Sequence, residues 1–365
     1  MGRRGAERWV RRWVAGALWL GLLLLPAAAL AADPGGDVPL LPHEASDQHQ
    51  GSILFYNLYS SSATDPRVED THFRLTNTST SSAAFVRLLF VNGDSGEVAH
   101  STICLTATQT ATFRASEIRP GQAGFLIAVS IDGVLGCPVS FNHLLGQADV
   151  RVAPGFRGSL GAVAFPALYD GSYPGCDGNS TIQPLRFDGA LLSGYPRLPR
   201  LLELSALASP VDARTLLVVN RVAGNLGSGL SALGTVSGLV FDDAQNGTPF
   251  TIEVEEPLDK APQVRAEVSG SFPATVPSVP SLVPSGRTGW LQIFPPSLGP
   301  AGYLGAVLTL QSGPGGPGSA VSSRSAALQG SPPTAAVTGA VNLRGGLVSV
   351  ETIQLLNFPI QPPTC

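Results

Sequence analysis

Thr71-His72-Phe73-Arg74-Leu75-Thr76 alternates polar and apolar side chains. Because successive side chains of a β-strand point to opposite faces, this stretch predicts a strand that turns Phe73 and Leu75 into a core and the residues between them into solvent. The same alternation returns in residues 250–255 and 264–268. The sequence therefore predicts antiparallel sheets with one face in water.

Short strands of this kind recur along the chain and are separated by turn-forming residues. Asn92-Gly93-Asp94-Ser95-Gly96 is typical of a hairpin turn, because Asn and Gly tolerate the positive φ that tight hairpins require. No segment after the first 32 residues has the sustained 3.6-residue period and caps of a helix. We therefore expect an all-β fold of sandwich type. Strands are predicted over residues 53–59, 71–76, 84–91, 98–105, 110–115, 124–131, 139–145, 181–187, 215–219, 236–241, 250–255, 264–268, 337–343 and 347–356.

Residues 1–31 have the three-part pattern of a secretory signal peptide. Five arginines precede an uninterrupted apolar run over residues 13–25, and small residues after Pro26 allow cleavage behind Ala31. An uncleaved anchor is the alternative, because the apolar segment extended to residue 32 approaches the ~20 residues of a spanning helix. Cleavage is the better prediction, since proline and alanines suit a peptidase. We expect a secreted, periplasmic or cell-surface protein without a stable membrane span.

The length after cleavage predicts two domains. Removing 31 residues from 365 leaves 334, which is more than one hydrophobic core usually serves. Residues 118–126 and 283–291 also align without gaps, and each places a glycine turn before a strand that begins with an aromatic residue. Phe125 and Trp290 are therefore predicted core anchors. The predicted segments are a flexible lead-in at 32–50, a first β-sandwich at 51–168, a junction at 169–199, and a second β-sandwich at 200–365 with a mobile Gly/Pro-rich loop at 312–319.

The charge of the chain limits its partners. The formal net charge of -4 includes five arginines and one glutamate of the leader, a contribution of +4, so the cleaved chain is near -8. Lys260 is the only lysine, and the arginines are scattered singly along the sequence. Surfaces that bind nucleic acid need clustered basic residues, so nucleic acid is not an expected partner.

Four cysteines follow the leader, namely Cys104, Cys137, Cys176 and Cys365. An even number in an exported protein predicts two disulfides, for which three connectivities are possible. We favour Cys104–Cys137 within one stretch of strands, together with Cys176–Cys365. No pair has the C-x-x-C spacing of a zinc site, so metal binding by these thiols is the weaker interpretation.

Several segments resemble a group of exported bacterial proteins whose domains look like immunoglobulin-type sandwiches. The resemblance implies two tandem antiparallel immunoglobulin-like β-sandwich domains, but it brings no ligand or reaction. The segments that carry it are Phe55-Tyr-Asn-Leu-Tyr-Ser-Ser-Ser62, Ile103-Cys-Leu-Thr-Ala-Thr-Gln-Thr-Ala111, Gly136-Cys-Pro-Val-Ser-Phe-Asn142, Asn220-Arg-Val-Ala-Gly-Asn-Leu226, Gly286-Arg-Thr-Gly-Trp290 and Pro359-Ile-Gln-Pro-Pro-Thr-Cys365.

Signatures of catalysis are scarce. The sequence has no G-x-S-x-G elbow, H-E-x-x-H zinc pair, P-loop or dinucleotide fingerprint. His43 and Glu44 with Asp47 and His49 are the one local cluster of metal-ligand types, but a flexible lead-in holds no preformed site, so no metal and no cofactor are expected. Paired carboxylates of a glycoside hydrolase would have to lie about 5–9 Å apart across a cleft, which no sequence pattern displays.

Residues 169–181 form the most suggestive loop, with aromatic residues between carboxylates and amides. Rings stack on the apolar faces of sugars while Asp and Asn bond hydroxyl groups, so this composition suits glycan recognition. Every one of these residue types also forms turns, and an ordinary disulfide-tied turn cluster is the stronger interpretation. The Asp spacing does not match a calcium loop. The candidate binding residues are Tyr169, Asp170, Tyr173, Asp177 and Asn179.

These observations favour an exported, non-enzymatic protein with a structural, adhesive or protein-interaction role. A glycan-binding module centred on residues 169–181 is the first alternative, and an exported hydrolase is the second. The expected partner is an extracellular protein or glycan, and the sequence leaves the oligomeric state open.

Overall fold

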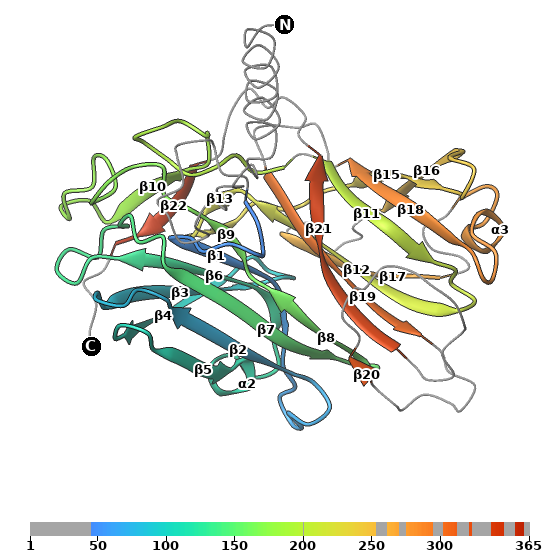
Figure 1. The fold of residues 1–365 in the computed structure, drawn as a ribbon, viewed down its shortest axis with the longest axis horizontal. Coiled ribbons are helices and arrows are strands. Elements are labelled where there is room, and N and C mark those ends of the chain that lie inside the picture. The colour runs from blue at the N-terminus through green and yellow to red at the C-terminus, as the bar shows by residue number, and fades with distance from the viewer. Residues whose placement is uncertain are drawn as a thin grey trace, which may run out of the picture. The chain divides into compact units, whose positions relative to one another are not determined.

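Figure 1 shows the chain in a computed structural model, in which strands dominate and the described helices, α2 (Ala115–Ile118) and α3 (Val279–Leu282), are short. An all-β fold with antiparallel sheets is therefore confirmed. No helix within the described residues is long and apolar enough to cross a membrane. The signal peptide, residues 32–44 of the lead-in and the loop at 312–319 lie outside these residues. The structure describes residues 45–199, 201–252, 261–269, 275–294, 302–311, 321–322, 337–346 and 355–360.

Two antiparallel sheets face each other in the first half of the chain and enclose one core. The orders are β4-β3-β6-β1-β9 and β5-β2-β7-β8. Tyr56 and Leu58 of the first sheet share a buried cluster with Phe73, Leu75 and Val150 of the second. The strands are β1 (Ile53–Ser60), β2 (Asp70–Asn77), β3 (Ala84–Asn92), β4 (Val98–Leu105), β5 (Thr110–Arg114), β6 (Ala123–Ile131), β7 (Leu144–Val152), β8 (Phe156–Gly161) and β9 (Val163–Phe165).

The second half forms a nine-stranded sheet and contributes to a small four-stranded one. Their orders are β16-β15-β18-β11-β21-β19-β12-β17, with β20 beside β21, and β10-β22-β13-β14. Leu202, Leu217 and Ile293 lie in the buried cluster of the larger sheet. The strands are β10 (Ile182–Arg186), β11 (Leu201–Ala208), β12 (Ala213–Val222), β13 (Gly224–Asn225), β14 (Gly229–Leu230), β15 (Val236–Phe241), β16 (Gly247–Ile252), β17 (Gln263–Val268), β18 (Thr288–Phe294), β19 (Gly302–Gln311), β20 (Val321–Ser322), β21 (Val337–Gly346) and β22 (Leu355–Pro359).

Side chains from both predicted domains meet in one core. Leu216 and Val218 of β12 and Ala306 and Leu308 of β19 belong to the same buried cluster as Tyr56. A chain of buried amides also crosses between the halves, since Asn220 Nδ2 donates to the carbonyl of Asn57 at 2.9 Å. The division at residues 169–199 stays a prediction.

Most predicted strands are confirmed, but the strand predicted at 139–145 is wrong. Residues 347–354 of the strand predicted at 347–356 lie outside the described residues. Residues 139–143 form a loop, held by a bridge between Val139 and Ser172, and β7 begins only at Leu144. Phe125 is a core anchor as predicted, being fully buried. Trp290 is not a core anchor. It is half-buried and stacks on Phe241 of the neighbouring strand, with ring centroids 3.6 Å apart.

The disulfide pairing differs from the one that we favoured. Cys137 is bonded to Cys176, not to Cys104, and the Cα atoms of the pair are 5.9 Å apart. The reason is tertiary, because Tyr173 N–H donates to the carbonyl of Pro138 at 2.8 Å and draws the two loops together. Cys104 is also disulfide-bonded, whereas Cys365 lies outside the described residues.

Candidate functional site

The outward face of the sheet β5-β2-β7-β8 carries one arginine from each of its four strands. Strand alternation turns Phe73 and Leu75 of β2 inward and His72 and Arg74 outward, as predicted. Antiparallel partners share a face, so Arg114 of β5 lies opposite His72. The registers of β2 with β7 and of β7 with β8 place Arg151 and Arg157 on the same outward face. We call Arg74, Arg114, Arg151 and Arg157 the arginine face.

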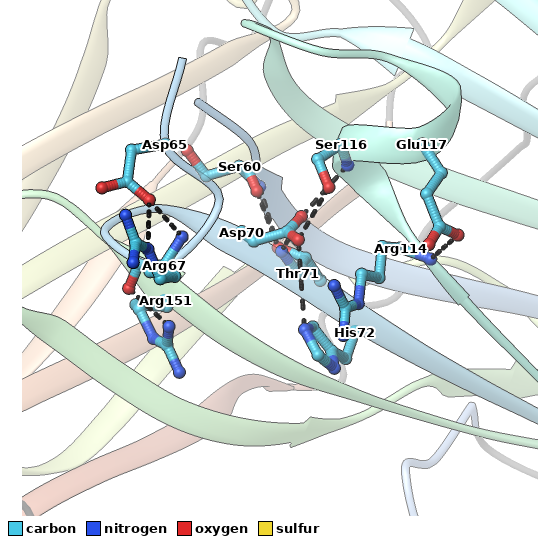
Figure 2. A network of polar contacts seen from close by, with 10 residues as sticks. All are labelled: Ser60, Asp65, Arg67, Asp70, Thr71, His72, Arg114, Ser116, Glu117 and Arg151. Carbon is cyan, nitrogen blue, oxygen red and sulfur yellow. Dashed lines mark hydrogen bonds and ion pairs between the residues drawn. The ribbon is translucent and has the colours of Figure 1, made fainter. Parts of the chain in front are cut away.

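A buried carboxylate organises one corner of this face (Figure 2). Asp70 is 2% exposed, and its Oδ1 accepts the backbone N–H groups of Thr71 at 2.9 Å and Ser116 at 3.0 Å. Its Oδ2 accepts the Ser116 hydroxyl at 2.8 Å. Ser116 belongs to the first turn of α2, whose N–H groups have no partner within the helix. Asp70 therefore caps α2 and ties it to β2.

The grouping of Asp70, Ser116 and His72 does not form a nucleophilic triad. Such a triad needs an imidazole that accepts the serine proton while a carboxylate orients the imidazole. Here Ser116 donates directly to the carboxylate, and His72 Nε2 lies 3.9 Å from the same Oδ2, too far for a hydrogen bond. The geometry describes a structural cap, and it offers no activated nucleophile at Ser116.

The arginines of the face differ in how far they are neutralised. Arg74 Nη2 lies 2.7 Å from Asp149 Oδ2, and both side chains are about half exposed. Arg151 Nη1 donates instead to the backbone carbonyl of Arg67 at 2.5 Å. Within the described part of the chain, no carboxylate forms an ion pair with Arg114, Arg151 or Arg157. Three of the four guanidinium groups thus have no ion-pair partner among the described residues, although Asp70 lies opposite Arg151 and the Glu117 carboxylate accepts the backbone N–H of Arg114.

The hairpin of β7 and β8 sets two of these charges against each other. Arg151 lies directly opposite Arg157 in the register of the pair. The turn between the strands holds Gly155 at φ 102°, a conformation that other residues rarely adopt, so the register is firmly set. Like charges directly opposite each other destabilise a sheet. Asp70 of β2 lies opposite Arg151 on the other side of β7, but neither arginine of the pair forms an ion pair with a carboxylate in the residues that the structure describes.

Tyr169 and Tyr173, the candidate stacking rings of the junction loop, are turned into the core. They are 4% and 2% exposed. Tyr169 packs edge-to-face against the buried ring of Tyr195, and Tyr173 stacks on the same ring. The hydroxyls of Tyr169 and Tyr195 are 2.7 Å apart, and burial raises the pKa of Tyr173 to about 12. Neither ring is presented to a ligand on the surface.

The polar members of that loop remain outside, where they stabilise their own turn. Asp170, Asp177 and Asn179 are exposed. Asn179 donates its backbone and side-chain N–H groups to the Asp177 carboxylate at 3.0 and 2.9 Å, which lowers the pKa of that carboxyl. The loop therefore separates the rings from the acidic groups, so the two kinds of group do not converge on one site.

The other predicted site residues stay apart. His72 is a surface residue as predicted, with its side chain 49% exposed. His43 and Glu44 lie outside the described residues, and across the described ranges no three His, Cys, Asp or Glu side chains gather as a metal site would require. Sequence reasoning missed the arginine face, although the alternation that it recognised in β2 already turned Arg74 outward.

Comparisons of the chain with models of protein families, with curated proteins and with solved structures found no match in any of the three.

Proposed function

We propose that this chain is an exported, non-enzymatic protein with an adhesive or structural role, and that it attaches to its partner through the arginine face. The observation that carries the proposal is the gathering of four arginines, one from each strand of a single sheet, with three lacking a carboxylate partner in the described residues. Each guanidinium group presents a planar fork of donors that matches anionic groups of a partner. Export itself is proposed from the leader sequence and accords with the disulfide between Cys137 and Cys176.

The carboxylate at the edge of the arginine face serves the fold. Asp70, the buried carboxylate next to the arginines, has its oxygens occupied by hydrogen bonds from Thr71 and Ser116. A general base must be able to accept a proton from a substrate, and these contacts hold both oxygens in a capping role instead. The hydrolase alternative therefore gains no support from this corner of the sheet.

Retention on the producing organism's envelope tests the proposal. Purified residues 32–365 are mixed with washed envelope material at low salt, and the bound fraction is measured after sedimentation. We expect clear retention that falls at least tenfold when the four face arginines are replaced by glutamine. Arg287→Gln is the matched control, because Arg287 is an exposed arginine outside this face whose side chain pairs with Asp243. Equal retention of the fourfold variant and the unchanged protein would refute the proposal.

A further inference from the structure

We infer that the arginine face binds an acidic polysaccharide, which it holds through carboxylate or sulfate groups. The inference rests on the proposed function and names the chemistry of the partner at the same face.

Charge complementarity is the first argument. Arg114, Arg151 and Arg157 form no ion pair with any carboxylate in the described ranges. A guanidinium group offers its donors as a planar fork that matches the two oxygens of a carboxylate or sulfate. The cleaved chain is acidic as a whole, but repulsion from distant carboxylates is screened beyond about 8–10 Å at ordinary salt. On the face itself four arginines stand against the carboxylates of Asp70, Asp149 and Glu117, and the Asp70 oxygens are occupied by donors, so the guanidinium groups of Arg114, Arg151 and Arg157 can act on a polyanion that touches this sheet.

The shape of the face indicates a polymer rather than a small anion. Each strand of the sheet β5-β2-β7-β8 carries one arginine. The four arginines therefore span three strand separations, or roughly 14 Å. The side chains rise from an open sheet, and their backbone positions do not converge on a single point. A chain with repeated anionic groups can contact several of these sites at once, whereas a single carboxylate reaches one or two.

The polar residues between the arginines are suited to sugar hydroxyls. Gln147 Nε2 donates to Ser159 Oγ at 2.5 Å, and Ser159 in turn donates to Asp149 at 2.8 Å. Thr112 of β5 stands beside Arg74 in the sheet register. Hydroxyl and amide groups in a row can exchange hydrogen bonds with the hydroxyls of a glycan that lies along the face.

The same face is poorly equipped for nucleic acid or lipid. In the four described strands His72 is the one outward side chain with an aromatic ring, whereas proteins that bind single strands stack bases on aromatic platforms. Leu145, 39% exposed, is the single large apolar side chain among the outward positions of β7. A lipid surface would need more apolar area than this to hold the protein.

The pairing of Arg151 with Arg157 gives an independent indication. Opposed like charges destabilise the hairpin, and an anion between them would convert repulsion into two attractive contacts. A face that served solubility alone could scatter its charges or alternate their sign. The like-charged pair therefore marks the position at which we expect one carboxylate or sulfate of the ligand.

Calorimetric titration of purified residues 32–365 tests the inference. The probes are polygalacturonate for carboxylate, dextran sulfate for sulfate, neutral dextran, and duplex and single-stranded DNA. We expect binding to at least one acidic polysaccharide and none to dextran. The affinity should fall roughly tenfold or more between 50 and 200 mM NaCl, because about four charges are neutralised. The difference between polygalacturonate and dextran sulfate identifies which anionic group is preferred.

Single variants locate the contact. Arg157→Gln should weaken binding roughly fivefold to tenfold, since one charge-assisted contact is lost. Arg157→Lys should recover part of the affinity, because the charge returns without the fork. Arg287→Gln is the control and should bind as the unchanged protein does.

Three results would overturn the inference: binding to neither acidic polysaccharide, binding to DNA as tight as to the better of the two, or full affinity in the variant with all four arginines replaced. If the polysaccharides fail while envelope retention still depends on the arginines, the proposed function survives and only this assignment of the partner falls. Unfolding curves for each variant separate loss of contact from loss of fold.

Discussion

The buried amides of Asn57, Asn220 and Gln263 make a sharp prediction about how the two halves of the chain unfold. Asn220 Nδ2 donates to both oxygens of Asn57, at 2.9 Å to the carbonyl and at 3.1 Å to the side chain. Asn220 Oδ1 accepts from Gln263 Nε2 at 2.7 Å. Asn57 Nδ2 donates onward to the carbonyl of Gly305 at 2.9 Å. Four strands from both predicted domains, β1, β12, β17 and β19, thus share one polar network in the core.

We expect Asn220→Ala to lower the free energy of unfolding by about 2–4 kcal/mol, because three buried hydrogen bonds are lost at about 0.5–1.5 kcal/mol each and a small cavity is left. Asn220 is fully buried, so water cannot replace its contacts without opening the core. This is a large share of the roughly 5–15 kcal/mol by which a typical domain is stable.

The assay follows each half of the chain separately. A protein that begins at residue 32 contains Trp290 as its only tryptophan, so fluorescence reports the sheet that includes β18. Hydrogen exchange of peptides from β6 reports the first half. If the amide network couples the halves, urea should unfold both together, and Asn220→Ala should shift both transitions by the same amount.

Gln147→Ala is the control, since Gln147 is an exposed residue of β7 and should leave the midpoint nearly unchanged. Two separate transitions in the unchanged protein, with Asn220→Ala moving the fluorescence alone, would refute the coupling and support independent tandem domains. If Asn220→Ala lowers the free energy of unfolding by less than about 0.5 kcal/mol, the magnitude that we assign to these buried hydrogen bonds is refuted.

Three further predictions concern stability. Replacing Cys137 and Cys176 by alanine should lower the free energy of unfolding by about 3–4 kcal/mol, because the disulfide closes a loop with a sequence separation of 39. Peptide mapping of the unchanged protein under non-reducing conditions should recover the two cysteines linked. Asp70→Ala should lower it by about 2–4 kcal/mol in urea titrations, because three donors lose a buried acceptor. Burial raises the pKa of Tyr173 from 10.0 to about 12. The stability that its buried neutral phenol contributes is therefore complete below pH 10, and it is lost as the pH rises to 12. Phenolate absorbance near 295 nm should then appear together with unfolding, and smooth titration of a folded protein at pH 10 would contradict this.

Local alternation predicted those strands that have one wet face, because it is a property of neighbours in sequence. The strands at Val98–Leu105 and Val236–Phe241 run as predicted. β19 (Gly302–Gln311) was missed because residues 302–308 are all buried, and a strand that is covered on both faces shows no alternation. The predicted strand at 139–145 contains apolar residues that alternate, but tertiary contacts hold its first half as a loop.

The direction of each side chain in the candidate loop depends on packing that composition does not record. Composition shows that tyrosines and carboxylates lie near each other in residues 169–181, but it does not show toward which side each residue points. Tyr169 and Tyr173 turn inward because Phe187 and Tyr195, further along the chain, complete an aromatic cluster around them. The disulfide partner of Cys137 depends on the same long-range packing, so spacing alone favoured the wrong pairing.

The arginine face shows what kind of information a single sequence leaves hidden and what it already contains. Arg74, Arg114 and Arg151 stand far apart in sequence, and only the strand order β5-β2-β7-β8 brings them to one face. That order depends on long-range strand pairing. The sequence alone therefore showed arginines scattered singly along the chain and did not show that they share a face. Arg151 and Arg157 are different, because a hairpin turn joins their strands and Gly155 marks its position. Had the turn been recognised, the alternation rule would have placed the two arginines opposite each other on the wet face. The like-charged pair was therefore accessible to local reasoning, and it is also the feature of the face that stability alone does not explain.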